Sequence, residues 1–330
     1  MAQVTIRDVA RVADVSVASV SRAMNGLDNV HPDTRARVLA AAAQLGYVPH
    51  AGARNLSMAR AHAIGVVLPD LHGEFFSEIV RGMDKEASSR GFQLLLSNMH
   101  QDPAQAGQAL RAMRGRVDGL LIMAPHLDAF DLLRGMPGNL PSVLVNCRAG
   151  SEVATILVDN VGGSDTMVRH LLANGHRAIA HIAGPQGNLD AEERLAGFRL
   201  SMRRHAGVEN PLVLPGDFRE EAGAAAARAL IAGGQRVDAV FAANDMMAIG
   251  CLLALREAGV DVPGRIAVAG FDDIPVARYL GLTTMRVRIA EIGARAVSRL
   301  CERLAGGGIP ATTELHAPDI VARTTTTMRA

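Results

Sequence analysis

Val17, Ala18 and Arg22 carry the most distinctive chemistry of this sequence. The two small, uncharged side chains allow the backbone beneath them to approach another surface closely. Arg22 follows one helical turn later, and a guanidinium can donate two parallel hydrogen bonds to O6 and N7 of a guanine. A helix that presents this set on one face can enter the major groove of DNA and contact base edges there.

The residues around this set predict the helices that would position it. Thr5, followed three residues later by Asp8, predicts that a first helix begins near residue 6. Ser16 is suited to cap a second helix, which carries the base-reading set. Pro32 favours the first position of a third helix, and Gly46 would end it. Three short helices of this kind are typical of a helix-turn-helix, although the pattern alone also fits a helical cap on an enzyme.

Charge is distributed unevenly between the amino-terminal part and the rest. Residues 1–60 hold seven arginines and four aspartates, whereas the formal net charge of all 330 residues is +1. A basic amino-terminal part in a chain that is otherwise slightly acidic suits contact with phosphates. The length allows two or three domains with a substantial buried core.

Residues 47–60 form an expected linker between these parts. Pro49 disfavours helix at the residue before it. The residues after it can form about two helical turns, which are marginal in water, and Gly52 costs roughly 1 kcal/mol relative to alanine. We therefore expect this segment to become ordered only with a partner.

From residue 61 onward, apolar runs alternate with amphipathic stretches, and this alternation implies parallel sheets. Ala63-Ile64 recurs as Ala178-Ile179, so we expect two similar lobes that face one cleft. The expected strands are 63–68, 92–97, 117–123, 142–145, 178–183, 237–242, 266–270 and 284–288, with a last one at 321–323. The expected helices are 74–90, 105–114, 163–174, 190–205, 222–232, 246–258 and 289–304.

Polar and aromatic side chains follow several of these strands. In open parallel sheets, ligands bind beyond the carboxyl ends of the strands. Carboxylates, amides and arginine can bind the hydroxyls of a sugar-like ligand, while aromatic rings support its apolar face. Simpler roles stay open: Asp245 as a helix cap, the paired phenylalanines as half-buried core, and Asn98 and Asn146 as turn residues. This rule selects Asp70, Leu71, Phe75, Phe76, Ser97, Asn98, Asn146, Arg194, Asn244, Asp245 and Asp272.

Other classes of function have little support in the sequence. It contains no catalytic or phosphate-loop motif and no histidine spacing for a metal, so we expect neither an enzyme nor a bound metal or other cofactor. Cys147, Cys251 and Cys301 are widely spaced and predict reduced thiols in the core. No stretch resembles a membrane span or a signal peptide, so we expect a cytoplasmic protein that does not contact membranes.

The sequence resembles the LacI/GalR family of transcriptional repressors from Val4 to about Arg323. The resemblance implies a small all-α helix-turn-helix domain followed by a two-lobed α/β core of parallel sheets, like that of periplasmic binding proteins. The residues that carry it are Val4-Thr5-Ile6-Arg7-Asp8-Val9-Ala10, Val15-Ser16, Val20-Ser21-Arg22, Gly46-Tyr47-Val48-Pro49, Arg194-Leu195-Ala196-Gly197-Phe198, Ala243-Asn244-Asp245 and Gly270-Phe271-Asp272-Asp273.

The resemblance implies roles for residues of the headpiece and the linker. It implies that Val17, Ala18 and Arg22 select the operator bases. It places Leu56 as an apolar wedge in the minor groove, with Ala53 beside it and Arg54 close to the DNA backbone. The residues that it places near phosphates are Thr5, Ser16, Ser21, Asn25 and Thr34.

The resemblance also implies an effector pocket in the core. It implies that Arg194, Asn244 and Asp272 line this pocket. Phe75 and Phe76 would form one of its walls. From the rule on strand ends we add Leu71, Asn98 and Asn146 as effector-binding candidates. Glu74 stands near the expected entrance, where the family often has proline, and it argues against a neutral hexose.

We therefore predict a sequence-specific, DNA-binding repressor whose affinity for a pseudo-palindromic operator is controlled by a small, sugar-like molecule. Two chains would pair through their cores, and the lack of a heptad tail favours a homodimer. The expected parts are a headpiece at 1–46, a hinge at 47–60 and a core at 61–330, with lobes of 61–158 plus 289–318 and of 159–288 plus 319–330. The alternatives are a solute-binding receptor of a transport system and a sugar-modifying enzyme.

Overall fold

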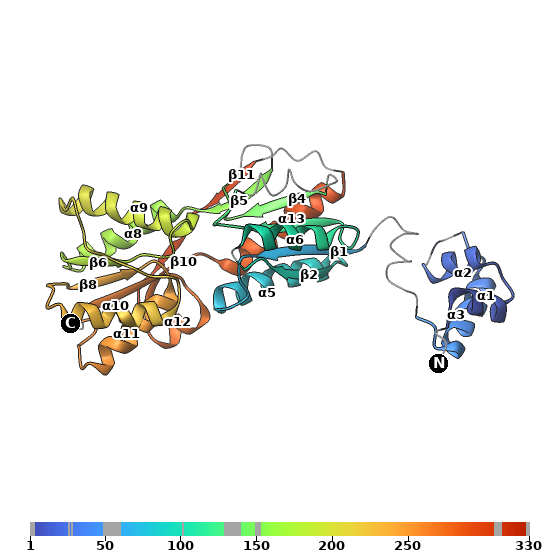
Figure 1. Ribbon diagram of the computed structural model, residues 1–330, viewed down its shortest axis with the longest axis horizontal. Helices are drawn as coiled ribbons and strands as arrows, with labels where there is room; N and C mark the ends of the chain where they lie inside the picture. Colours follow the sequence, from blue (N-terminus) through green and yellow to red (C-terminus); the bar gives the residue numbers. More distant parts are fainter. Residues whose placement is uncertain are drawn as a thin grey trace. The chain divides into compact units, whose positions relative to one another are not determined.

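The computed structural model describes residues 4–25, 27, 29–48, 61–100, 102–128, 140–148, 153–306 and 312–327. These residues form a three-helix headpiece and a core of two α/β lobes (Figure 1). The expected fold class is confirmed. Throughout the parts of the chain that are described, no helix combines the length and the apolarity that crossing a bilayer requires.

The headpiece consists of α1 (Ile6–Ala13), α2 (Val17–Met24) and α3 (Pro32–Leu45), each beginning where the capping residues predict. Thr5 and Asp8 form a complete capping box on α1. The Ser16 hydroxyl accepts a hydrogen bond from the Ser19 amide at 3.1 Å, which caps α2. Gly46 ends α3 in the left-handed conformation. The buried centre is small, with only alanine and valine: Val9, Ala10, Ala13, Val20, Ala23, Val38, Ala41 and Ala42.

The first lobe is built on a six-stranded sheet in the order β11-β5-β4-β3-β1-β2. Its strands are β1 (Ala63–Leu68), β2 (Gln93–Asn98), β3 (Gly119–Met123), β4 (Ser142–Val145), β5 (Ala154–Val158) and β11 (Thr313–His316). Its helices are α5 (Glu74–Ser89), α6 (Pro103–Met113) and α13 (Ile289–Leu304). The central pairs are parallel, with Ile64 opposite Gly119 and Leu120 opposite Ser142.

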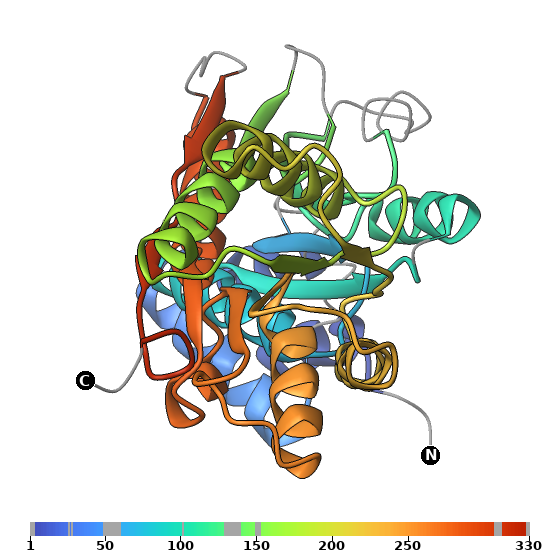
Figure 2. The same ribbon diagram turned by 90° about the vertical axis from the view of Figure 1, so that its left-hand side faces the viewer.

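The second lobe repeats this strand order as β12-β10-β9-β8-β6-β7. Its strands are β6 (Ile179–Ile182), β7 (Val213–Leu214), β8 (Ala239–Ala242), β9 (Ala267–Asp272), β10 (Thr283–Arg286) and β12 (Asp319–Val321). Its helices are α8 (Asn160–Ala173), α9 (Leu189–Ser201) with the π-helical turn Met202–Ala206, α10 (Glu220–Ala232), α11 (Asp245–Glu257) and α12 (Pro275–Tyr279). Figure 2 shows α8 and α9 on one face of this sheet and α10 and α11 on the other.

Small residues let helices approach closely in both lobes. A Cβ on Gly82 of α5 would lie 1.9 Å from the carbonyl oxygen of Ala290 in α13, and one on Gly223 of α10 would lie 1.9 Å from that of Met247 in α11. Neither position tolerates a side chain without moving a helix. These contacts pack the two helices of each pair directly against each other.

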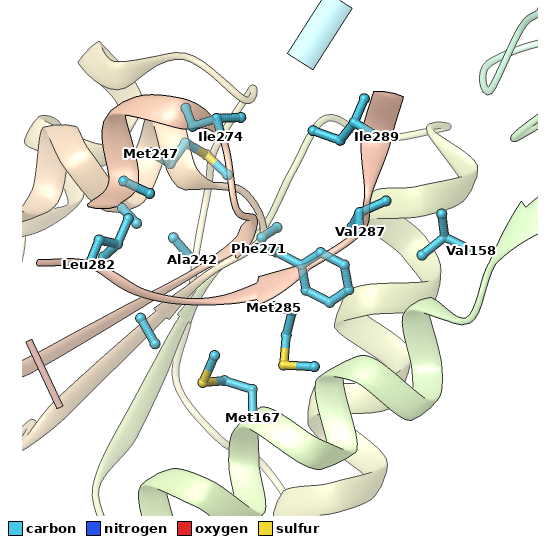
Figure 3. Packing of buried hydrophobic residues seen from close by; sticks show 14 of the residues in the cluster. Val158, Met167, Ala242, Met247, Phe271, Ile274, Leu282, Met285, Val287 and Ile289 are labelled. Atoms are coloured by element: carbon cyan, nitrogen blue, oxygen red, sulfur yellow. The ribbon is translucent and has the colours of Figure 1, made fainter. Parts of the chain in front are cut away.

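One apolar cluster fills the interior of the core and extends through both lobes. Figure 3 shows Phe271, Met285 and Met167 together in this cluster, contributed by β9, β10 and α8. Ile289, the first residue of α13, belongs to it as well. At this crossing between the lobes, Val287 and Ile289 are both buried.

Candidate functional site

A cavity of about 270 Å³ lies between the two lobes, beyond the carboxyl ends of their strands. Such an edge is where open parallel sheets bind ligands. The first lobe contributes Pro69, Asp70, His72, Gly73, Glu74, Phe75, Phe76, Met123, Pro125 and His126. The second contributes Pro185, Asn188, Asp190, Arg194, Asp217, Phe218, Arg219, Glu220, Asn244, Met246, Asp272 and Ile274.

Arg194, on α9, is the centre of a buried polar network at this cavity. Its Nε donates to Asn160 Oδ1 at 2.9 Å, and its Nη1 donates to the Ala243 carbonyl at 2.6 Å. Nη1 also lies 3.1 Å from Asp272 Oδ1. The guanidinium stacks over the Phe271 ring, 3.9 Å from its centroid. Because every contact is short and the side chain is buried, Arg194 has one defined position.

Two buried carboxyl groups face this arginine. Burial raises the pKa of Asp272 to about 7, and the nearby guanidinium of Arg194 opposes that rise. Burial also raises the pKa of Asp190. Its two oxygens accept hydrogen bonds from the amides of Asn160, at 2.9 Å, and Asn146, at 3.2 Å. Burial therefore favours the protonated form of both carboxyl groups, and Arg194 opposes this by favouring the charged form of each.

Asparagine side chains stabilise the loops around the cavity. Asn244 caps α11 by accepting from the Met247 amide at 3.0 Å, and its Nδ2 donates to the Phe218 carbonyl at 3.0 Å. Asn188 caps α9 in the same way, and its Nδ2 lies 3.3 Å from Nε2 of His126 in the first lobe. Burial lowers the pKa of His126, which favours the neutral ring that accepts this hydrogen bond.

The first turn of α5 forms the opposite wall. Phe75 and Phe76 meet edge to face, with ring centroids 5.5 Å apart and an interplanar angle of 82°. Glu74 Oε2 accepts a hydrogen bond at 3.2 Å from the amide of Val276 in the second lobe. The Leu189 amide donates to the Pro125 carbonyl at 2.9 Å. Direct hydrogen bonds therefore join the lobes at two places near the cavity.

Five of the eight effector candidates line this cavity: Phe75, Phe76, Arg194, Asn244 and Asp272. Three others lie elsewhere. Leu71 is 46% exposed, and Asn98 accepts from the His100 amide at 2.8 Å within a turn. Asn146 is buried behind Asp190 and supports that carboxylate.

Sequence reasoning overlooked several residues of the lining. Asn188 and Asp190 follow β6, so the rule on strand ends contained the signal for them. Phe218 and Glu220 follow β7, which has only two residues and no apolar pattern long enough to predict a strand. His126 is recognisable only from its contact with the opposite lobe.

The base-reading candidates share one face of α2. Val17 is 42% exposed, and Ala18 and Arg22 are exposed as well, while Val20 and Ala23 are buried against the other helices. The phosphate candidates lie close to helix ends or on partly exposed faces. Thr5 donates its hydroxyl to Asp8 at 2.7 Å, and Ser16 caps α2. Ser21, Asn25 and Thr34 are half-buried.

The hinge candidates Ala53, Arg54 and Leu56 lie outside the described residues. In the parts that are described, no group of histidine, cysteine, aspartate and glutamate side chains could hold a metal ion. Cys147, Cys251 and Cys301 are buried free thiols. Burial raises the pKa of Cys147 and Cys251 to about 12, so both are protonated and unreactive at neutral pH.

Comparisons with known proteins match both parts of this structure. Residues 5–50 match the model of bacterial regulatory proteins of the lacI family, and residues 168–326 match a periplasmic binding protein-like domain. The ribose operon repressor of Escherichia coli (strain K12) is 35% identical over 308 residues, which cover 91% of this chain and 93% of that protein. The chain belongs to the LacI family.

Further relatives agree with this family. The HTH-type transcriptional regulator GalR of Escherichia coli (strain K12) is 33% identical over 327 residues, covering 97% of this chain and 94% of that protein. A structure of the Lac repressor dimer bound to operator and the anti-inducer ONPF superimposes with a TM-score of 0.87 at 29% identity, covering 99% of this chain and 100% of that one. These relatives are transcriptional regulators and not enzymes. Membership of the LacI family makes this chain a DNA-binding regulator with an effector-binding core.

Proposed function

We propose that this LacI-family chain is a cytoplasmic repressor without enzymatic activity, whose homodimer places two headpieces on a pseudo-palindromic operator. The proposal rests on one combination: a helix with Val17, Ala18 and Arg22 exposed stands in the same chain as a cavity enclosed by two lobes. A sugar-like effector in that cavity would change operator affinity. A protein that binds DNA works in the compartment that holds the DNA, which is the reason for the proposed location.

The two-sided cavity supplies a physical basis for this control. A ligand that contacts both lobes favours the lobe arrangement that it fits best, and the difference in affinity between arrangements is the coupling energy. Hydrogen bonds such as the one that the Val276 amide donates to Glu74 already join the lobes. Ligand contacts would add to these bonds or compete with them. In this proposal Arg194, Asn244 and Asp272 hold the effector, and Phe75 and Phe76 cover it.

In the proposed DNA complex, α2 lies in the major groove and Arg22 donates to a guanine. Val17 and Ala18 would contact neighbouring bases, and the helix ends near Thr5, Ser16 and Thr34 would face phosphates. Leu56, in the proposed hinge at 47–60, would insert into the minor groove, where an apolar wedge kinks the duplex.

Replacing Arg22 with alanine tests the DNA half of this proposal. We expect the variant to lose about 1–3 kcal/mol of discrimination at one base pair of the operator, measured as binding to a set of single-base operator variants. Arg37→Ala is the matched control, since it removes one exposed positive charge from α3. It should weaken binding to all sequences alike. Unchanged base preference in the Arg22 variant would contradict the assigned role.

A further inference from the structure

The lining of the interlobe cavity is strongly acidic. Six carboxyl groups face two guanidinium groups, and one of the two, Arg194, is already ion-paired with Asp272. The remaining guanidinium belongs to Arg219, at the start of α10. The carboxyl groups are those of Asp70, Glu74, Asp190, Asp217, Glu220 and Asp272.

The cavity also has few hydrogen-bond donors to offer a ligand. The amide Nδ2 of Asn244 donates to the Phe218 carbonyl, and that of Asn188 lies within hydrogen-bond distance of His126. Arg194 directs its Nε and Nη1 toward protein acceptors. A sugar hydroxyl both donates and accepts, whereas a carboxylate only accepts. The guanidinium of Arg219 and Nη2 of Arg194 are still donors, but six carboxyl groups line the same cavity, so it suits a ligand that brings more donors than acceptors.

A buried acceptor in this lining is incompletely satisfied. Asp272 is 5% exposed, and its Oδ1 receives no well-aligned hydrogen bond from any described residue, although the Arg194 guanidinium lies 3.1 Å away. This oxygen is held by the ion pair and can accept one further hydrogen bond, which a donor on a bound ligand would provide.

Aromatic rings in the cavity lining also favour the binding of a cation. Phe75 and Phe76 line the cavity from the first lobe, and Phe218 lines it from the second. The negative face of an aromatic ring attracts an ammonium group, and the attraction grows when the group is removed from water. Carboxylates, an acceptor that can take a further hydrogen bond, and ring faces together are the surroundings that a protonated amine prefers.

We propose that the effector of this protein is a small, hydroxylated ring compound that carries a protonated amine, such as an amino sugar. This inference rests on the proposed function, since it assigns a chemical class to the same cavity. The volume of about 270 Å³ suits a compact ligand. The amine lies among the carboxylates of α10 and α5, and the ring lies against the phenylalanines.

The test uses the full-length protein and pairs of sugars that differ in charge. Glucosamine is compared with glucose, galactosamine with galactose, and N-acetylglucosamine serves as a bulky, uncharged counterpart. Isothermal titration at about pH 7 keeps most of each amine protonated and leaves Asp272, whose pKa is about 7, partly ionised. We expect at least one amine to bind about tenfold or more tightly than both uncharged counterparts, since each nearby carboxylate adds to the attraction. Equal or weaker binding of every amine overturns the inference.

A pair of adjacent glutamates supplies a matched control. Glu220 lines the cavity, whereas Glu221 is exposed and outside the lining. Glu220→Gln should reduce the preference for the amine several-fold, and Glu221→Gln should leave it unchanged. An equal effect of both variants would show that only the overall charge matters and would overturn the inference. Binding of neutral sugars alone, with a change in operator affinity, would overturn it while the proposed function stands.

Discussion

The two lobes of the core share one strand order but differ in chemistry at matching positions. Ile64 opposite Gly119 in the first lobe corresponds to Ile179 opposite Ala239 in the second. Counting along β3 and β8 from these pairs, Ala124 of the first lobe matches Asn244 of the second. Ser142 of β4 and Val268 of β9 also occupy matching positions, because the residues that they pair with are equivalent. Counting along the chain from these two residues, Asn146 matches Asp272.

This difference indicates that the two lobes have different roles in ligand binding. Asn146 and Asp272 both adopt positive φ, at 46° and 115°, so an unusual backbone conformation occurs at the same position in both lobes while the side chain differs. The second lobe concentrates buried, hydrogen-bonded groups around Arg194. The first lobe contributes half-buried rings and carboxylates from α5. We infer that the second lobe orients a ligand and that the first lobe covers it.

Among the variants that test this difference between the lobes, Arg194→Ala should have the largest effect on stability and on ligand binding. It leaves Asp272 and Asn160 buried without their partner, and breaking a buried pair costs about 3–5 kcal/mol. Urea unfolding measures this loss, and sugar titration should show no binding. Arg203→Ala removes an arginine whose pair with Glu209 is 57% and 67% exposed, so it should change stability by less than about 1 kcal/mol. Similar losses for both variants would contradict the importance of the buried network.

Acidification should destabilise the second lobe through His181. This side chain is fully buried, stacks 4.8 Å from Phe198, and has neither ring nitrogen hydrogen-bonded among the described residues. Burial lowers its pKa to about 3. The unfolded chain takes up the proton near pH 6.5, so stability is full above that pH and falls by about 1.4 kcal/mol per pH unit below it. At about pH 4.5 the loss is about 2.7 kcal/mol.

His181→Leu should remove this pH dependence, measured as the difference in unfolding free energy between variant and parent from pH 7 to about 4.5. Val66 occupies the matching position of β1 in the first lobe and cannot titrate. Val66→Leu should therefore shift stability by the same amount at every pH. A constant difference between His181→Leu and the parent would show that the histidine takes up its proton in the folded state.

Phe76→Leu should have a smaller effect, confined to ligand binding. It removes the edge-to-face contact with Phe75, and such pairs contribute about 0.5–1.5 kcal/mol beyond the area that they bury. Calorimetry with the tightest-binding sugar measures the change in affinity. Leu96→Ala is the control, since Leu96 is 44% exposed on β2 and outside the cavity. A Phe76 variant that binds as tightly as the parent would argue against the covering role of the first lobe.

Glu192→Gln should have the smallest effect. Glu192 forms an ion pair with Arg148 of the other lobe, but the two side chains are 44% and 53% exposed. Exposed pairs contribute about 0–1 kcal/mol and are weakened by salt. Unfolding at low and high ionic strength should show that the small difference from the parent disappears in salt. A loss above about 2 kcal/mol would mean that the lobes are joined mainly by charge.

Local signals in the sequence predicted much of the fold. Thr5 and Ser16 cap their own helices, Pro32 takes the first position of α3, and β1 and β4 begin and end where their apolar runs do. The strands β5, β7 and β11 and the short helix α12 were missed. β7 has two residues, and the burial of β11 alternates weakly along an edge of its sheet. Such elements are stabilised by neighbouring strands more than by their own pattern.

The sequence by itself determined the helix-turn-helix, the alternation of strands and helices, and the convergence of Arg194, Asn244 and Asp272 on one edge, because each follows from spacing along the chain. Only the tertiary structure decided that Asn146 supports Asp190 from behind and that Phe218 and Glu220 complete the cavity. Those roles depend on which segments, distant in sequence, become neighbours in the folded chain, and no local pattern encodes that proximity.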